Sequence, residues 1–129
     1  TFSLGDVGED VVFTTAGFAI KGSPLEAFDT AFEQKYGSAP ESIYSAVGYD
    51  LIKVIEAAVI VAGSTDPTKI RDAMADLENV QGATGLITYK GTNGMPVRQV
   101  SLIRVKDGGR ELVGQPSPDA NLIPAPRMQ

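Results

Sequence analysis

The sequence contains no cysteine and no histidine. Without cysteine, the chain has no disulfide, no thiol nucleophile and no zinc-thiolate site. Without histidine, it lacks the commonest general base and the commonest transition-metal ligand. Catalysis would have to rely on carboxylates, lysine or tyrosine alone. An enzyme of that kind remains an alternative, but the two absences argue against enzymatic activity, and we expect a protein that is not an enzyme and that needs no cofactor or metal.

Long apolar runs and basic clusters are also missing. No segment approaches the about 18 consecutive apolar residues of a membrane-spanning helix. The 11 Lys and Arg are scattered and outnumbered by 16 Asp and Glu, which gives a net charge of −5. Phosphate binding needs clustered basic residues, so nucleic acid is not an expected partner. The 129 residues, 43% hydrophobic and 21% charged, are enough for one domain with one core.

The first half of the chain predicts one strand and three helices. The β-branched run Val11–Thr15 indicates a strand. Ser23, Pro24 and Glu26 form a helix start with a capping box. The resulting elements are a helix from Pro24 to Tyr36 that Gly37 ends, a helix from about Ser42 to Ala62 that Gly63 ends, and a third helix that Asp66 caps and Pro67 begins. The second is apolar on more than one side, which favours burial between layers.

The second half of the chain predicts strands. Leu86–Tyr89 and Val97–Val105 have strand composition, and Asp107-Gly108-Gly109 supplies the positive φ angles of a tight hairpin into a further strand. Residues 115–129 are proline-rich and exclude a regular helix. The order β-α-α-α-β-β-β indicates an α/β or α+β unit in which three helices cover a small sheet.

Two local patterns bear on other kinds of site. Asp72 and Asp76 lie one helical turn apart, but two carboxylates do not define a metal site, and a solvated face explains them better. The glycine-rich Gly82-Ala83-Thr84-Gly85 is not a phosphate loop, because no Gly-Lys-Ser/Thr and helix follow it. The beginning of a strand explains these glycines better.

Four segments together resemble one family. They are AFEQKYGSAPES, SAVGYDLIKVIEAAVIVAGS, DPTKIRDAMADL and GATGLITYKGTNGMPVRQVSLIRVKDG. In this order they are similar to the C-terminal portion of type I periplasmic solute-binding proteins. The best-known members bind branched-chain amino acids and serve ABC importers. No single motif is specific, but the ordered combination covers roughly residues 10–125.

The resemblance implies part of a fold with two Rossmann-like α/β lobes, joined by three crossover segments around a ligand cleft. Residues 1–129 would be a single C-terminal fragment, incomplete alone, with hinge-crossing strands near 11–15 and 97–105 and a proline-rich tail at 115–129. The chain begins with Thr1 rather than Met, as expected for a fragment or a processed product. The implied location is periplasmic or otherwise extracytoplasmic, although the chain shows no secretion signal.

The resemblance also implies a function and two ligand-binding residues. The expected ligand is a small solute, an amino acid or a related acid, and the partner of the full protein is an ABC permease. Tyr44, at the start of the second helix, corresponds to a family position where an aromatic side chain reaches the cleft. Phe18 follows the first crossover and can face the cleft; for both, ordinary packing is the alternative. Tyr49 and Asp50 are assigned to packing and hydrogen bonding.

The missing part of the fold has a physical consequence. Apolar helix faces and strand edges that lack their sheet should seek a partner. We expect a homo-oligomer, strand exchange between copies, or another chain that completes the sheet; a compact rearranged unit is the alternative. Two further functions stay open. One is a sensory ligand-binding module of the same fold, and the other is a non-binding fragment that acts in self-association.

Overall fold

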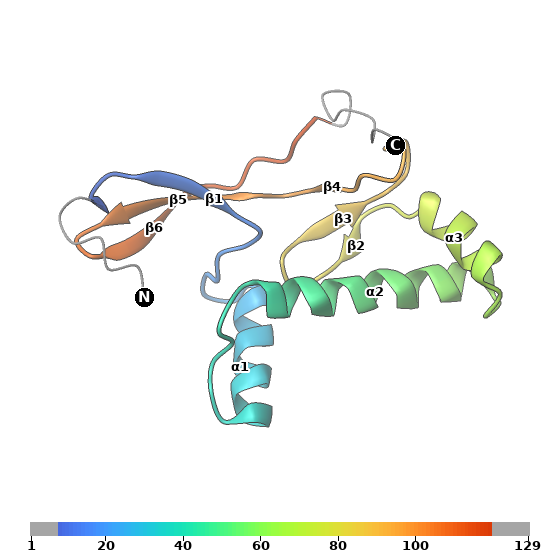
Figure 1. Ribbon diagram of the computed structural model, residues 1–129, viewed down its shortest axis with the longest axis horizontal. Helices are drawn as coiled ribbons and strands as arrows, with labels where there is room; N and C mark the ends of the chain where they lie inside the picture. Colours follow the sequence, from blue (N-terminus) through green and yellow to red (C-terminus); the bar gives the residue numbers. More distant parts are fainter. Residues whose placement is uncertain (1–7, 120–129) are drawn as a thin grey trace.

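The computed structural model describes residues 8–119 (Figure 1). In chain order the elements are β1 (Val12–Thr15), α1 (Pro24–Tyr36), α2 (Tyr44–Ala62), α3 (Pro67–Ala75), β2 (Val80–Gln81), β3 (Leu86–Thr88), β4 (Val97–Arg98), β5 (Ser101–Lys106) and β6 (Gly109–Gly114). The strands form two antiparallel sheets, with the orders β1-β5-β6 and β2-β3-β4. The expected α/β unit with three helices is confirmed, but it has two small sheets rather than one.

The first helix begins and ends as its sequence predicts. The Ser23 hydroxyl accepts a hydrogen bond from the Glu26 amide at 3.2 Å. The Glu26 carboxylate reaches one residue further back than a capping box requires, and it accepts from the Gly22 amide at 2.6 Å. Gly37 closes the helix in the left-handed region at φ 77°, where glycine carries no steric penalty.

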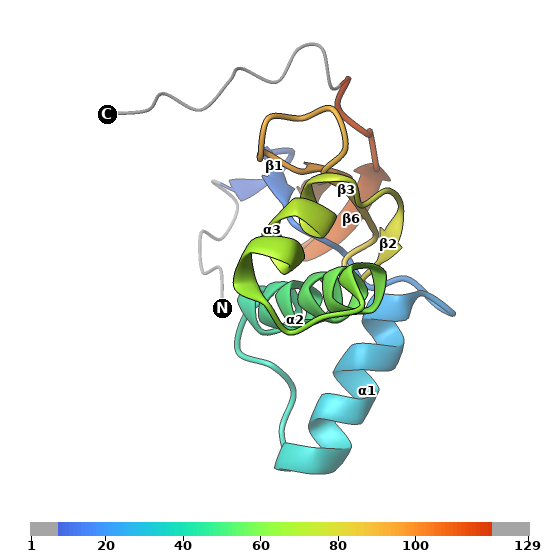
Figure 2. The same cartoon turned by 90° about the vertical axis from the view of Figure 1, so that its right-hand side faces the viewer.

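The second and third helices form a pair. Gly63 ends α2 with a positive φ, and Asp66 caps α3 by accepting from the amides of Thr68 and Lys69. Figure 2 looks along α2 and shows α3 lying across it. The predicted start of α2 was two residues early, because the helix begins at Tyr44.

The predicted strand over residues 97–105 is interrupted. Val97 and Arg98 pair with β3 in one sheet, whereas Ser101–Lys106 pairs with β1 in the other. Gln99 and Val100 therefore connect the two sheets and belong to neither of them. The apolar, β-branched composition of the segment correctly predicts extended backbone, but composition carries no information about which partner each half meets.

The β5–β6 hairpin is built as expected. Asp107 and Gly108 both have positive φ, 51° and 70°, which is the type I′ geometry that matches the twist of the flanking strands. Beyond β6 the chain has no regular secondary structure through residue 119. The rest of the predicted proline-rich tail, from residue 120 on, lies outside the described residues.

The core is divided between two clusters along α2. One contains Val54, Ala58, Leu77 and Ile87, and the other contains Leu25, Ala46 and Ala83. The opposite side of α2 is uncovered in residues 8–119: Ile52 is 62% exposed and Ile60 is 72% exposed. The prediction of burial between two layers therefore holds on one side of α2 only, because this chain supplies a single layer against it. None of the helices in the described part of the chain combines the length and hydropathy that a membrane span needs.

Candidate functional site

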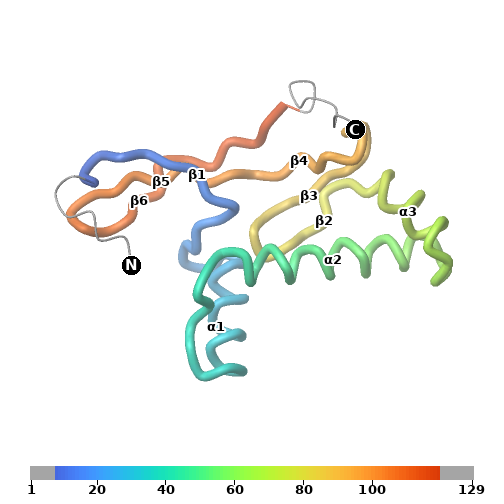
Figure 3. The backbone as a smooth tube through the Cα atoms, viewed as in Figure 1, coloured from blue at the N-terminus to red at the C-terminus, as the bar shows by residue number. Residues whose placement is uncertain are grey.

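Three stretches of chain meet where the two sheets join. Residues 16–23 lead from β1 to α1, and Gln99-Val100 leads from β4 to β5; these are called the first and second connecting segments. The chain beyond β6 runs back beside the second segment, as the tube in Figure 3 shows. There the Val100 amide donates to the Pro116 carbonyl at 3.3 Å, and the Gln115 side-chain amide donates to the Ser101 hydroxyl at 3.1 Å.

An open hollow of about 410 Å³ lies at this joint. Both connecting segments and the stretch between β2 and β3 contribute to its wall. Its apolar side chains include Phe18, Ile20, Leu25 and Leu86, and its polar ones include Lys21, Gln99 and Gln115. Ile20 and Leu86 are 45% and 44% exposed, so the hollow offers apolar surface that the chain itself does not cover.

One wall of the hollow is the glycine loop, Gly82–Gly85, which turns the chain from β2 into β3. The Gly82 amide closes the loop by donating to the Gly85 carbonyl at 2.9 Å. Gly85 has a φ of 126°, a backbone conformation that residues other than glycine rarely adopt. A Cβ on Gly82 would lie at most 2.9 Å from all three carboxylate atoms of Asp50. The loop therefore needs both glycines to approach α2 this closely.

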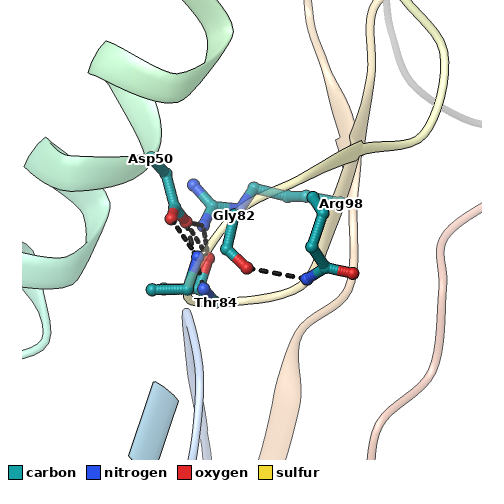
Figure 4. Close-up of polar contacts among 6 residues, drawn as sticks. Asp50, Gly82, Thr84 and Arg98 are labelled. Carbon is teal, nitrogen blue, oxygen red and sulfur yellow. Dashed lines mark hydrogen bonds and ion pairs between the residues drawn. The ribbon is translucent and has the colours of Figure 1, made fainter. Parts of the chain in front are cut away.

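Asp50 holds the glycine loop onto α2. It lies on the buried stripe of the helix, between Ala46 and Val54, and is only 2% exposed. Its carboxylate accepts from the Ala83 amide at 2.5 Å, from the Thr84 amide at 3.2 Å and from the Thr84 hydroxyl. Figure 4 shows the side chain pointing from the helix into the loop. A buried carboxylate is stable when its lone pairs are occupied in this way.

Arg98 extends this network to the second connecting segment. Its guanidinium donates to the Thr84 hydroxyl, and Nη2 lies 3.6 Å from Asp50 Oδ2. The Thr84 hydroxyl thus donates to Asp50 and accepts from Arg98, which uses its single proton once. Arg98 Nε is buried and has no partner within residues 8–119. The guanidinium is therefore only partly satisfied by the described contacts.

The structure places the two predicted ligand-binding residues differently. Phe18 lines the hollow. Tyr44, the first residue of α2, is 77% exposed and lies outside the hollow. Their neighbours meet, because a Cβ on Gly17 would lie 3.4 Å from Ile43 Cδ1. The two aromatic residues therefore flank one contact between α2 and the first connecting segment, and a role for either in binding stays a prediction.

The remaining assignments concern Asp50, Tyr49 and the acidic residues of α3. Asp50 is a hydrogen-bonding residue as expected, although its partners lie in the glycine loop. The Tyr49 ring packs against the Phe28 ring, with 5.4 Å between the two ring centroids. Asp72 is exposed and paired with Arg71. The sequence reasoning did not identify Thr84, Arg98 or Gln99; the available signal was Asp50 itself, an acid on the i, i+4 stripe of otherwise buried small residues.

The sequence model described as "Periplasmic binding protein" matches residues 3–110. The chain belongs to this family. The resemblance drawn from the four motifs is thereby confirmed, and so is the expectation of a protein that is not an enzyme, because the family consists of solute-binding proteins. The name of the family implies a location outside the cytoplasm. A comparison with proteins of curated function gave no match.

Solved structures of the family have the same fold. The leucine-binding protein LivK of Thermotoga maritima is 30% identical, with a TM-score of 0.68 over 86% of this chain and 32% of that one. A putative branched-chain amino acid ABC transporter protein of Rhodospirillum rubrum is 26% identical, with a TM-score of 0.73 over 84% and 32%. A solute-binding protein of R. palustris in complex with benzoate, 20% identical, has a TM-score of 0.66 over 88% and 32%. The chain spans about a third of the length of these relatives and forms part of the type I periplasmic binding protein fold.

Proposed function

We propose that this chain is the C-terminal part of the extracytoplasmic solute-binding component of an ABC importer. The expected solute is a branched-chain or other amino acid, or a related small carboxylate. The observation that carries the proposal is the hollow at the joint of the two sheets, where both connecting segments and the glycine loop meet. Family membership supports the class of function, and the hollow supports a location for the solute.

The lining of the hollow suits a small amphipathic molecule. Phe18, Ile20 and Leu86 can pack on an apolar group, while Lys21 can attract a carboxylate, and Gln99 can hydrogen-bond to a polar group. Leucine and benzoate, named for two of the relatives, share this combination of an apolar body and a carboxylate. Tyr44 does not line the hollow of this chain, so its proposed aromatic contact would be with a part of the solute that extends beyond the hollow.

The position of the hollow suggests how binding would be transmitted. Phe18 lies in the segment that leads from β1 to α1, and Gln99 lies in the segment that joins the two sheets. A solute held between them would therefore favour one orientation of the β1-β5-β6 sheet relative to the rest of the chain. Such a change requires that the solute bind the closed arrangement more tightly than the open one. In the full-length protein the closed form would be presented to a permease. This chain alone supplies only part of the contacts and is expected to bind weakly.

Calorimetric titration of the full-length protein that carries this segment tests the proposal. The probes are leucine, isoleucine, valine and benzoate. We expect saturable binding of at least one, and Phe18→Ala should weaken it. The control is Phe32→Ala, a half-buried phenylalanine of α1 that is not part of the hollow. Absence of binding by all four probes, or equal losses in the two variants, would contradict the proposed site.

A further inference from the structure

The glycine loop touches both connecting segments at once. A Cβ on Gly17, in the first segment, would lie 3.4 Å from Thr84 Cβ. A Cβ on Gly85 would lie 3.2 Å from the side-chain oxygen of Gln99, in the second segment. Arg98, the last residue of β4, is bonded to the Thr84 hydroxyl. The loop is therefore in contact with the segment that leads from β1 to α1 and with the segment that joins the two sheets.

One of the residues that anchor the glycine loop is unusual. Asp50 does not line the hollow, yet it accepts three hydrogen bonds from Ala83 and Thr84, which do. It is also the one charged residue on the buried stripe of α2. A small apolar residue at this position would continue the stripe and leave the two loop amides without these acceptors. Burying a carboxylate here is costly unless its hydrogen bonds are all made. The need to hold the glycine loop against α2 therefore explains an aspartate at this position better than packing does.

We propose that Asp50 is a positioning residue for solute binding. Through Thr84 it fixes the glycine loop against the first and second connecting segments, and it thereby sets the arrangement of the two sheets around the hollow. This inference rests on the proposed function for its effect on affinity. Its structural part, a coupling of Asp50 to both connecting segments, stands independently of any solute.

The coupling follows from the geometry of short, charge-assisted bonds. Hydrogen bonds to a carboxylate are about twice as strong as neutral ones. When Asn replaces Asp50, one carboxylate oxygen becomes an amide donor that faces the Ala83 or Thr84 donor groups. At least one loop bond is lost. Where the amide group replaces Oδ2, the Thr84 hydroxyl loses the acceptor of its proton and keeps the bond that it accepts from Arg98. The loop is then held from one side, and its contacts with Gly17 and Gln99 loosen.

The test compares three variants of the full-length protein by hydrogen exchange and by solute titration. Asp50→Asn removes the anchor. Leu77→Ala destabilises the other end of α2, where Leu77 is buried with Val54 and Ala58, and so controls for loss of stability. Asp72→Asn neutralises an exposed, ion-paired carboxylate. All measurements are made well below the lowest melting temperature, so that each protein is folded.

In Asp50→Asn, we expect faster amide exchange in residues 82–85 and also in residues 16–23 and 99–101, together with about tenfold weaker solute binding. Neither control should change exchange in both connecting segments. If exchange rises only within the glycine loop, or if Leu77→Ala reproduces the pattern, the inference is wrong. Unchanged affinity despite altered exchange would likewise overturn the role in binding.

Two complications have defined outcomes. If Asp50→Asn does not fold, Arg98→Gln takes its place; it removes the bond to Thr84 and should speed exchange in residues 99–101 while leaving residues 82–83 protected. Unchanged exchange in residues 99–101 would refute the coupling.

If the unmodified protein binds none of the four probes, the proposed function fails, and the exchange pattern alone then decides whether Asp50 couples to both segments.

Discussion

Arg98 Nη2 lies 3.6 Å from Asp50 Oδ2, and the Thr84 hydroxyl is bonded to both side chains. This pair joins the middle of α2 to the end of β4, the point at which the chain leaves one sheet for the other. The arginine is the more exposed partner, with 27% of its side chain accessible against 2% for the aspartate. Loss of the aspartate would leave the amides of Ala83 and Thr84 without their acceptor, whereas loss of the arginine would leave the buried carboxylate with its loop bonds but without its countercharge.

Substitutions of two glycines test how tightly α2 and the glycine loop pack. Gly82→Ala places a Cβ on the Asp50 carboxylate and should lower the free energy of unfolding by about 1–3 kcal/mol. Gly48→Ala is the matched control, because it lies within α2 and its Cβ would meet nothing within 4 Å. It should raise stability by about 1 kcal/mol. Urea denaturation measures both, and a neutral Gly82→Ala would refute the close approach.

The sequence predicted elements well where local chemistry determines them. Ser23 and Asp66 as caps, Gly37 and Gly63 as helix ends, and the Asp107-Gly108 turn all act within a few residues of their own position. Pairing of residues 97–105 could not be predicted in the same way, because it depends on β1 and β3, which are distant in the sequence. A single continuous strand was therefore expected where two sheets share the segment.

The candidate site was predictable only in part. Phe18 was predicted to face the cleft through the family resemblance; it lines the hollow, and its contact with a solute stays a prediction. Thr84 and Arg98 carry no local signal, because their role depends on contacts with Asp50, which is distant in the sequence. Thr84 and Asp50, for example, are separated by 34 residues. An acid between Ala46 and Val54 on the buried stripe of α2 was the visible anomaly, and it calls for a partner without naming one.

Tyr44 offers a test of ligand contact that is separate from stability. The side chain is 77% exposed, so Tyr44→Ala should change the free energy of unfolding by no more than about 0.5 kcal/mol. If Tyr44 meets the solute, binding by the full-length protein should weaken severalfold. Tyr36→Ala, at the far end of α1 and 61% exposed, is the control for removing a surface tyrosine. A large drop in melting temperature with intact affinity would make Tyr44 a packing residue.

Asp29 predicts a small dependence of stability on pH. Partial burial on α1 raises the pKa of its carboxyl group above the ordinary 3.8. The folded state then binds more protons than the unfolded state, so stability falls as the pH rises from 3.8 through the raised pKa. Asp29→Asn should be more stable at neutral pH by a few tenths of a kcal/mol, given solvent screening, and this gain should vanish below pH 3.8.

The control for Asp29 is Glu33→Gln, an exposed residue of the same helix. Denaturation of both variants at several pH values measures the difference. A gain for Asp29→Asn that persists unchanged below pH 3.8 would show that its cause is not the desolvated charge.

The uncovered side of α2 predicts self-association of the 129-residue chain. Leu51, Ile52 and Ile60 are all more than half exposed, and together they present apolar surface along one helix. Burial of such surface favours association by about 25 cal/mol per Å². Light scattering over a concentration series should therefore show a mass that rises with concentration. Ile52→Lys should shift the chain toward the monomer, because a charge would have to be buried in the contact.

The matched control is Thr65→Lys, which adds the same charge at an exposed position beyond the end of α2. It should leave the association unchanged, so that an effect of Ile52→Lys reports on the apolar side of the helix rather than on net charge. A monomeric mass at all concentrations, with cooperative thermal unfolding, would instead mean that the three helices and two sheets form a self-sufficient unit. The exposed residues of α2 would then be tolerated on the surface, and the expectation of an incomplete lobe would be wrong.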